Sequence, residues 1–144
     1  MAIQSHRDLI VWNKAMDLTV QVYEITSKFP TSERWRLVDQ LCRAAASVPA
    51  NIAEGQGRSS SKDFAHFLAI ARGSLNETER YLMLAVRLGY LEAARAEPIL
   101  ALITEVSKML GSLRTKLNSA PNSLTGDYPL SAIHYLLPRA DILA

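Results

Sequence analysis

The sequence predicts an all-α protein, an antiparallel up-down four-helix bundle followed by an irregular C-terminal tail. Six glycines and six prolines in 144 residues are too few for a sandwich or barrel with many turns. Long stretches rich in Ala, Leu, Arg and Glu carry apolar residues at helical spacing. The length suits one domain with one core. We therefore expect the bundle over residues 8–118 and the extension over 119–144.

The first helix is expected within residues 7–30, with a length of roughly 20 residues. Pro30 ends it, because the residue before a proline disfavours the helical conformation. Apolar residues recur at spacings of two to four along this segment, with polar residues between them. The expected inward positions are Leu9, Trp12, Met16, Leu18, Val20, Tyr23 and Ile25.

The second helix is expected to begin at Thr31 as N-cap, with Glu33 in the first turn, where the helix dipole favours an anion. Pro49 removes one backbone donor, but the apolar stripe keeps its phase on both sides of it. We therefore expect a kinked, continuous helix that ends near Gly55. Its expected inward positions are Val38, Leu41, Cys42, Ala45, Val48 and Ile52.

The third helix is expected to follow Ser60, which forms a motif close to a capping box with Asp63, and to stop at Gly89. The fourth covers roughly 93–118, with Pro98 either in an irregular first turn or at the start of the regular helix. The expected inward positions of the third helix are Phe64, Phe67, Leu68, Ala71, Leu75, Thr78, Leu82, Ala85 and Val86, and those of the fourth are Ile99, Leu102, Ile103, Val106, Leu110, Leu113 and Leu117.

The segment after the fourth helix contains prolines that forbid one long helix and apolar residues that argue against free disorder. We expect residues 128–144 to dock on their own bundle or on a neighbour.

A polar stripe runs beside the apolar stripe of the second helix, and the third helix carries similar residues in "ARGSLNETER". Small residues on both helices favour a close approach. We expect Arg43 to pair with Glu77 or Glu79, and Glu54 to pair with Arg72. An alternative is that these arginines bind an anion or RNA phosphate. We call this set the polar seam: Arg43, Asn51, Glu54, Arg72, Glu77 and Glu79.

Positive charge is concentrated around the second helix. Residues 34–72 contain six arginines and lysines against three acids, a local excess of +3, whereas the whole chain carries +2. If the polar seam engages Arg43 and Arg72, the remaining cations are free to bind nucleic acid. The candidate nucleic-acid-binding residues are Arg34, Arg36, Arg58 and Lys62.

Enzymatic motifs are absent from the sequence, so we expect a protein that is not an enzyme and has no cofactor. Asp63 and His66 have metal-ligand spacing on a helix, but di-iron bundles need a second such motif and further carboxylates. The single cysteine, Cys42, lies in the apolar stripe and is expected to be a packed thiol. Trp12 and Trp35 are expected to be core or interface anchors in preference to platforms for base stacking.

The cellular setting is expected to be the cytoplasm. One cysteine excludes an intramolecular disulfide framework. The N-terminus lacks the apolar region of a signal peptide, and no apolar run approaches the roughly 20 residues that span a bilayer. We therefore expect a soluble protein.

The stretch "CRAAASVPANIAEGQGR" at residues 42–58, followed by Asp63-Phe64, Phe67-Leu68 and "GSLNETE", resembles the four-helix-bundle proteins encoded in intervening sequences of bacterial 23S ribosomal RNA genes. The resemblance covers residues 8–117 and includes "LIVWNKAMDL" and "GYL". Cys42 stands where that family often has a second arginine. The resemblance implies an antiparallel bundle that assembles into a ring-like homopentamer. It extends distantly to the accessory protein of diversity-generating retroelements, a basic pentamer that works with a reverse transcriptase and nucleic acid.

Two functional hypotheses follow. The first is an oligomer that associates with RNA or DNA through arginine-bearing surfaces, in which five copies would raise the charge to roughly +10. The second is a structural or protein-interaction bundle, in which the same arginines are paired internally. Apolar residues in excess of what four helices cover favour self-association in both.

Overall fold

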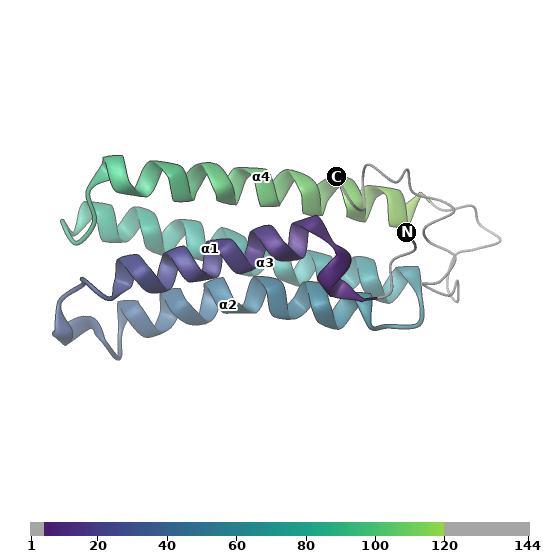
Figure 1. Cartoon of the computed structure of the whole chain (residues 1–144), viewed down its shortest axis with the longest axis horizontal. Helices are drawn as coiled ribbons and strands as arrows, with labels where there is room; N and C mark the ends of the chain where they lie inside the picture. The colour runs from purple at the N-terminus through teal and green to yellow at the C-terminus, as the bar shows by residue number, and fades with distance from the viewer. Residues whose placement is uncertain (1–4, 120–144) are drawn as a thin grey trace.

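The computed structural model describes residues 5–119, and the expected docking of residues 128–144 lies outside them. The described chain forms four α-helices (Figure 1): α1 (Ile10–Thr26), α2 (Leu37–Gln56), α3 (Ser61–Arg87) and α4 (Ala93–Asn118). Two short 3-10 turns, η1 (His6–Asp8) and η2 (Thr31–Glu33), precede α1 and α2. Pro98 lies inside α4, five residues after its start.

Successive helices pack side by side and run antiparallel, which confirms the expected four-helix bundle. α2 lies between α1 and α3, and α4 completes the bundle by packing against α3 and α1. The connections are short, and those between α1 and α2 and between α3 and α4 lie at the same end (Figure 1). Short loops between consecutive helices are what an up-down bundle requires.

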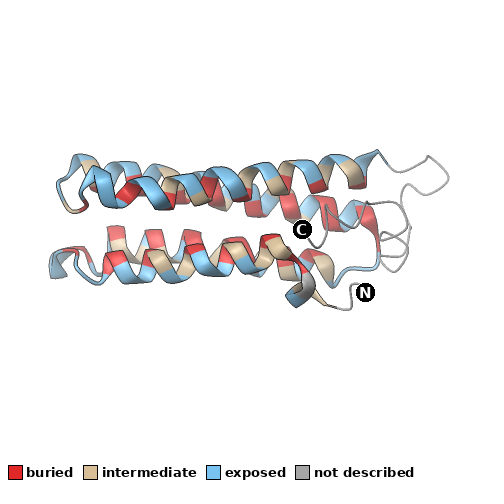
Figure 2. Ribbon diagram, turned by 45° about the horizontal axis from the view of Figure 1, so that its top comes forward, coloured by how far each residue is buried: buried red, intermediate tan, exposed pale blue. Residues whose placement is uncertain are grey.

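Buried residues recur along all four helices (Figure 2). Most of them are leucine and other aliphatic residues. Burying one such side chain contributes about 1.5–3 kcal/mol relative to leaving it exposed. The buried stripes of α2, α3 and α4 follow the expected positions closely, with only Val38, Cys42, Phe67, Val86 and Leu102 half-buried.

The inward face of α1 differs from the expected one. Its buried residues are Val11, Ala15, Leu18, Val22, Ile25 and Thr26. Met16, Val20 and Tyr23 were expected to face the core but are 39%, 54% and 55% exposed. Because α1 carries two apolar stripes, spacing alone did not reveal which one meets the other helices. The second stripe remains on the surface.

The start of α2 also corrects the sequence prediction. Thr31 begins the separate turn η2, and α2 starts six residues later at Leu37. Glu33 nevertheless serves the helix N-terminus, because its Oε2 accepts a hydrogen bond from the Leu37 backbone N–H at 3.2 Å. The carboxylate thus satisfies one of the backbone donors that a helix start leaves without a partner.

α2 continues through Pro49, as expected from its apolar phase. Proline has no N–H, so the Ala45 carbonyl loses its usual helical donor. The Thr19 hydroxyl of α1 lies 3.1 Å from that carbonyl and 2.8 Å from the carbonyl of Ala15. Thr19 therefore supplies from the neighbouring helix the donor that Pro49 lacks.

The α2–α3 turn brings two helices into close contact at Gly55. A Cβ on Gly55 would lie 2.7 Å from the Phe67 Cβ and 2.9 Å from the Phe64 ring. Ser60 then caps α3, its Oγ accepting from the Asp63 N–H at 3.2 Å, as the sequence predicted. At the other end of α3, Gly89 has a φ of 79°, which favours glycine.

Candidate nucleic-acid interface

The charged members of the polar seam do not pair between α2 and α3, which corrects the prediction. Arg43 Nε lies 3.1 Å from Asp39 Oδ1, and the Arg43 side chain is 77% exposed. Glu54 Oε1 lies 2.8 Å from Arg58 Nη2. Both pairs join residues four apart in sequence, Arg43 with Asp39 within α2 and Glu54 with Arg58 just after its end, so neither needs a second helix.

Small polar groups hold α2 to α3 instead. The Ser74 hydroxyl donates to the Ser47 hydroxyl at 2.9 Å. Asn51 Nδ2 donates to the same Ser47 oxygen at 2.9 Å and to the Ser47 carbonyl at 2.8 Å. These residues are half-buried. A close approach with short hydroxyl contacts leaves no room for an arginine and a glutamate between the helices.

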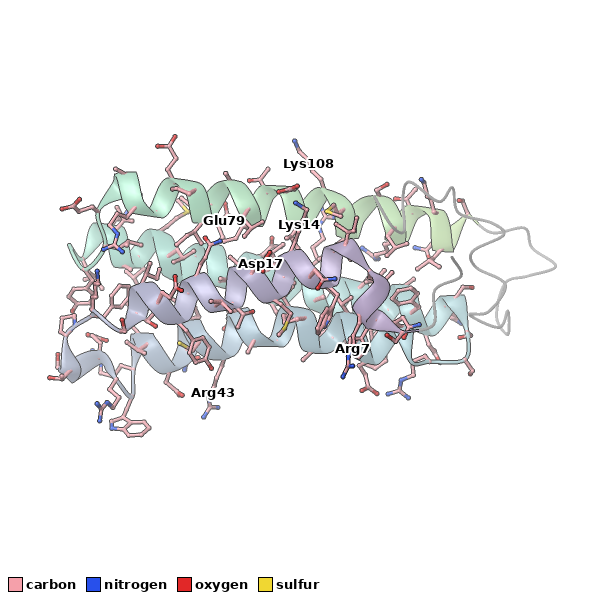
Figure 3. All side chains as sticks on the ribbon, viewed as in Figure 1. Arg7, Lys14, Asp17, Arg43, Glu79 and Lys108 are labelled. Atoms are coloured by element: carbon pink, nitrogen blue, oxygen red, sulfur yellow. The ribbon has the colours of Figure 1, made fainter. Side chains whose placement is uncertain are left out.

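Of the residues that α3 contributes to the polar seam, Arg72 and Glu79 lie toward α4, and Glu77 lies beside Tyr81. Arg72 is exposed, and its guanidinium approaches Gly111 of α4, since a Cβ there would lie 3.5 Å from Nη1. Glu77 neighbours Tyr81, and burial together with that carboxylate raises the pKa of the Tyr81 hydroxyl. Glu79 lies toward α4, whereas Arg43 points away from the bundle at the edge of α2 (Figure 3).

The four candidate nucleic-acid-binding residues divide into two pairs at opposite ends of α2. Arg34 and Arg36 precede the helix, and Arg58 and Lys62 follow it. At 1.5 Å per residue, the 20 residues of α2 separate the pairs by roughly 30 Å. One protomer therefore presents two small basic surfaces, not one continuous patch.

Exposed charge between residues 28 and 62 is almost entirely positive. The six cations of this segment are all exposed, whereas of its three acids only Glu54 is exposed. Asp39 is half-buried and Glu33 is buried at 8% exposure. The exposed cations are Lys28, Arg34, Arg36, Arg43, Arg58 and Lys62.

Arg58 was expected to have no partner within the chain, but it contacts both a carboxylate and an aromatic ring. Besides its pair with Glu54, its guanidinium carbon lies 4.8 Å from the centroid of the Phe67 ring. An exposed ion pair of this kind contributes about 0–1 kcal/mol, so a phosphate can replace the carboxylate at small cost. Lys62 and Arg34 form no ion pair with any carboxylate among residues 5–119.

The α1–α2 connection, residues 27–36, is anchored by Tyr90 from the α3–α4 turn. Its hydroxyl donates to Glu33 Oε1 at 3.2 Å, and its ring lies 5.8 Å from that of Phe29. Burial and the Glu33 hydrogen bond raise the pKa of the Tyr90 hydroxyl. Arg36 Nη1 lies 3.9 Å from the same Glu33 oxygen. The connection is thereby held in one conformation against the bundle.

Trp35 does not lie in the core, which is one of the two positions expected for it. It is 81% exposed on the α1–α2 connection, and the other expected position, an interface anchor, stays a prediction. Trp12, by contrast, packs against the core and lies 4.8 Å from the His6 ring. The sequence signal was present in the flanking residues, since Arg34 and Arg36 on either side of Trp35 are uncommon neighbours for a buried side chain.

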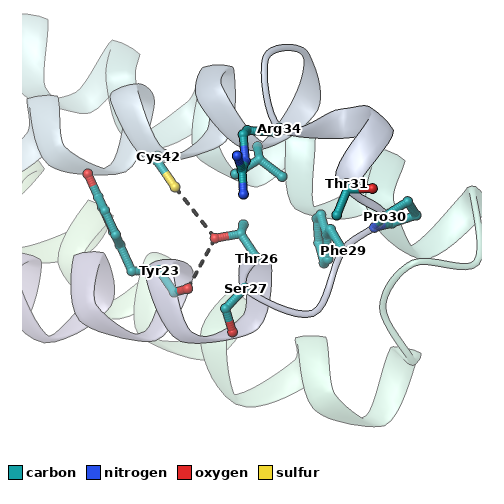
Figure 4. A pocket seen from close by; sticks show the side chains of 9 residues that line it. Tyr23, Thr26, Ser27, Phe29, Pro30, Thr31, Arg34 and Cys42 are labelled. Carbon is teal, nitrogen blue, oxygen red and sulfur yellow. Dashed lines mark hydrogen bonds between the residues drawn. The ribbon is translucent and has the colours of Figure 1, made fainter.

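A hollow of about 250 Å³ opens beside this connection, between α1 and α2 (Figure 4). Cys42 lies at its floor, its Sγ 3.5 Å from the Thr26 hydroxyl. Arg34 lines the rim, which is otherwise largely apolar. The remaining lining residues are Tyr23, Ser27, Phe29, Pro30, Thr31 and Val38.

Metal-ligating side chains do not gather in the described part of the chain, where no group of three or more His, Cys, Asp or Glu residues is arranged to hold an ion. His66 is exposed and contacts the Phe67 ring, with centroids 5.8 Å apart. Within residues 5–119, no helix has the length and apolar character needed to cross a membrane.

Comparison with known protein families shows to which family the chain belongs. Residues 7–112 match the family model of the 23S rRNA-intervening sequence protein. The chain belongs to this family. The match covers nearly the whole bundle, from η1 to the last turns of α4, so the family accounts for the fold and for the sequence motif at residues 42–58.

A solved structure supports the same assignment. The chain is 30% identical to a protein of unknown function from the S23 ribosomal protein family of Bacteroides thetaiotaomicron VPI-5482, with a TM-score of 0.66. The similarity covers 73% of this chain and 98% of that protein. A search of the curated proteins finds no match.

Proposed function

We propose that this member of the 23S rRNA-intervening sequence family is a non-enzymatic homo-oligomer, a ring of five copies, that associates with RNA or DNA through its exposed arginines and lysines. The observation that carries the proposal is the sign of the exposed charge around α2. Six exposed cations face one exposed acid between residues 28 and 62.

Nucleic acid suits this distribution because the two basic surfaces of a protomer lie roughly 30 Å apart along α2. Each surface alone offers two or three phosphate contacts. A ring repeats them, and several weak contacts to one polymer add as multivalency. The expected binding is tolerant of sequence, since exposed cations contact phosphates and not base edges.

Exposed apolar residues on the outside of α1 support self-association. Met16, Val20 and Tyr23 share one side of α1, and Tyr23 borders the same hollow as Val38 and Cys42. Exposed apolar residues that form a continuous face are typical of protein interfaces. Arg34 also lines that hollow, whereas Arg58 and Lys62 lie at the other end of α2, away from it.

The proposal is tested with a labelled structured RNA and a purified oligomer at two salt concentrations. The logarithm of the association constant should fall with the logarithm of salt by about 0.7–0.9 per phosphate contacted. Arg58→Ala with Lys62→Ala should flatten that dependence while the oligomer stays intact. Lys108→Ala is the matched control, since Lys108 is an exposed cation of α4 outside residues 28–62.

Absence of binding at low salt by an intact oligomer would contradict the proposal. The protein would then be a structural or protein-interaction bundle, the other hypothesis from the sequence.

A further inference from the structure

We infer that the α1–α2 connection is a site for unpaired nucleotides, in which Trp35 stacks on a base while Arg34 and Arg36 hold the adjoining phosphates. The inference rests on the proposed function and specifies which surface binds and which form of nucleic acid it prefers. Its basis is the placement of one exposed aromatic ring between two exposed cations on an anchored segment.

The exposure of Trp35 is large for its residue type. Tryptophan side chains are usually mostly buried, yet Trp35 is 81% exposed, the highest value among the exposed large hydrophobic residues of residues 5–119. An indole in water on a folded segment offers a flat face to a partner. Stacking of bases on such rings is the way single-stranded nucleic acid is held without sequence readout.

The charges on the connection favour an anionic partner. Lys28, Arg34 and Arg36 are exposed, and Glu33, the one acid in residues 27–36, is buried. The Glu33 carboxylate is already bound by the Leu37 N–H and the Tyr90 hydroxyl. The surface that a partner meets therefore carries positive charge with no exposed carboxylate from its own segment.

The backbone around Trp35 is fixed before any partner arrives. The Arg34 N–H donates to Thr31 O at 3.2 Å, and the Arg36 N–H donates to Glu33 O at 3.0 Å. Phe29 and Glu33 bind the segment to Tyr90. Because the segment loses little conformational entropy on binding, little of the stacking free energy is offset.

Duplex nucleic acid fits this arrangement less well, since its bases are already stacked on one another and present only their edges. Unpaired nucleotides expose the base faces that an indole stacks upon. We therefore expect the site to prefer a single strand over a duplex of the same length.

The test uses an oligouridylate of about twelve nucleotides, within the site sizes of single-strand binders, and a duplex RNA of equal length. Trp35→Ala should weaken binding of the single strand by about fivefold to a hundredfold, and Trp35→Phe should retain most of the affinity. Arg34→Ala and Arg36→Ala should each lower the salt slope by about 0.7. Lys108→Ala, the control on α4, should change neither quantity.

Tryptophan fluorescence reports contact between a base and Trp35 directly. The chain has two tryptophans, and the other one, Trp12, is packed against the core. Adding the oligouridylate should quench the emission of the wild-type protein but not that of Trp35→Phe. Light scattering on every variant reports the oligomer.

Three results would overturn the inference. If the wild-type protein binds and Trp35→Ala binds equally well, the proposed function stands and the site lies elsewhere. If Trp35→Ala changes the oligomeric mass, Trp35 contacts protein and not a base. If neither RNA binds at low salt, the site and the proposed function both fall.

Discussion

Thr19 and Pro49 are two residues whose roles depend on each other. The Thr19 hydroxyl reaches the Ala45 carbonyl that Pro49 leaves without its helical donor. Thr19→Val keeps the shape of the side chain and removes the hydroxyl. A buried carbonyl without a donor costs about 1–3 kcal/mol, and urea unfolding should report that loss.

The double variant Thr19→Val with Pro49→Ala is the informative partner, because alanine restores an N–H for the Ala45 carbonyl. It should cost less than the sum of the two single changes. Thr104→Val is the control, since that exposed hydroxyl bonds only to the Leu100 carbonyl of its own helix. Additive losses in the double variant would show that the two residues act independently.

Tyr90 makes stability depend on alkaline pH. Its pKa is raised in the folded protein by burial and the bond to Glu33, so the unfolded chain loses that proton first as pH rises. The stabilising contribution is present below the ordinary tyrosine pKa of about 10 and is lost as pH rises through the folded value. Melting temperatures between about pH 9 and 11 should fall less in Tyr90→Phe.

Tyr23→Phe, at an exposed position, should keep the wild-type dependence on pH. The same slope for Tyr90→Phe and the wild-type protein would mean that the bond to Glu33 does not persist in solution.

At the scale of helices, the contact between α2 and α3 depends on the absence of a side chain at Gly55. In Gly55→Ala the new Cβ would meet Phe67 and Phe64 at less than 3 Å. Overpacking of this kind costs about 1–3 kcal/mol, and the free energy of unfolding should fall by that amount.

Gly73→Ala is the matched control. Gly73 lies within α3, and a Cβ there meets nothing within 4 Å. The change should raise stability by about 1 kcal/mol through helix propensity. Equal effects of the two substitutions would show that α2 and α3 do not approach closely at Gly55.

The helices themselves could be predicted because periodicity, Ser60, Gly89 and the prolines all indicate the same boundaries. The start of α2 could not, because Thr31 begins the short turn η2 and does not cap the long helix. Only Tyr90, distant in sequence, shows what holds Glu33 in place. The same limit applies to α1, whose two apolar stripes are equivalent until the other helices are placed.

The candidate site was predicted in part. Charge concentration around α2 was visible in the sequence, but the pairing across the polar seam was wrong. Partners four residues away in sequence were available for Arg43 and Glu54. Such local pairs lose less side-chain entropy than pairs across a helix contact. The exposure of Trp35 depends on where α2 begins, so helical spacing alone did not exclude a core position for it.

For the whole molecule, self-association is the first expectation to test. Val20 is 54% exposed on the apolar face of α1, so Val20→Glu should leave the fold intact and place a charge in the proposed interface, where an unpaired buried charge is costly. Light scattering should show the mass falling toward the protomer value of 15.9 kDa.

Ala101→Glu, at an exposed position of α4, should leave the oligomeric mass unchanged. An unchanged mass in Val20→Glu would place the interface elsewhere on the bundle.

The most direct test of the central claim is the affinity of the intact oligomer for a structured RNA, measured at about 50 and 200 mM salt. Binding is expected at the lower salt and should weaken by at least tenfold at the higher one. The dependence on salt should be flatter in the double variant Arg58→Ala with Lys62→Ala. An oligomer of unchanged mass that binds no RNA at the lower salt would contradict the claim.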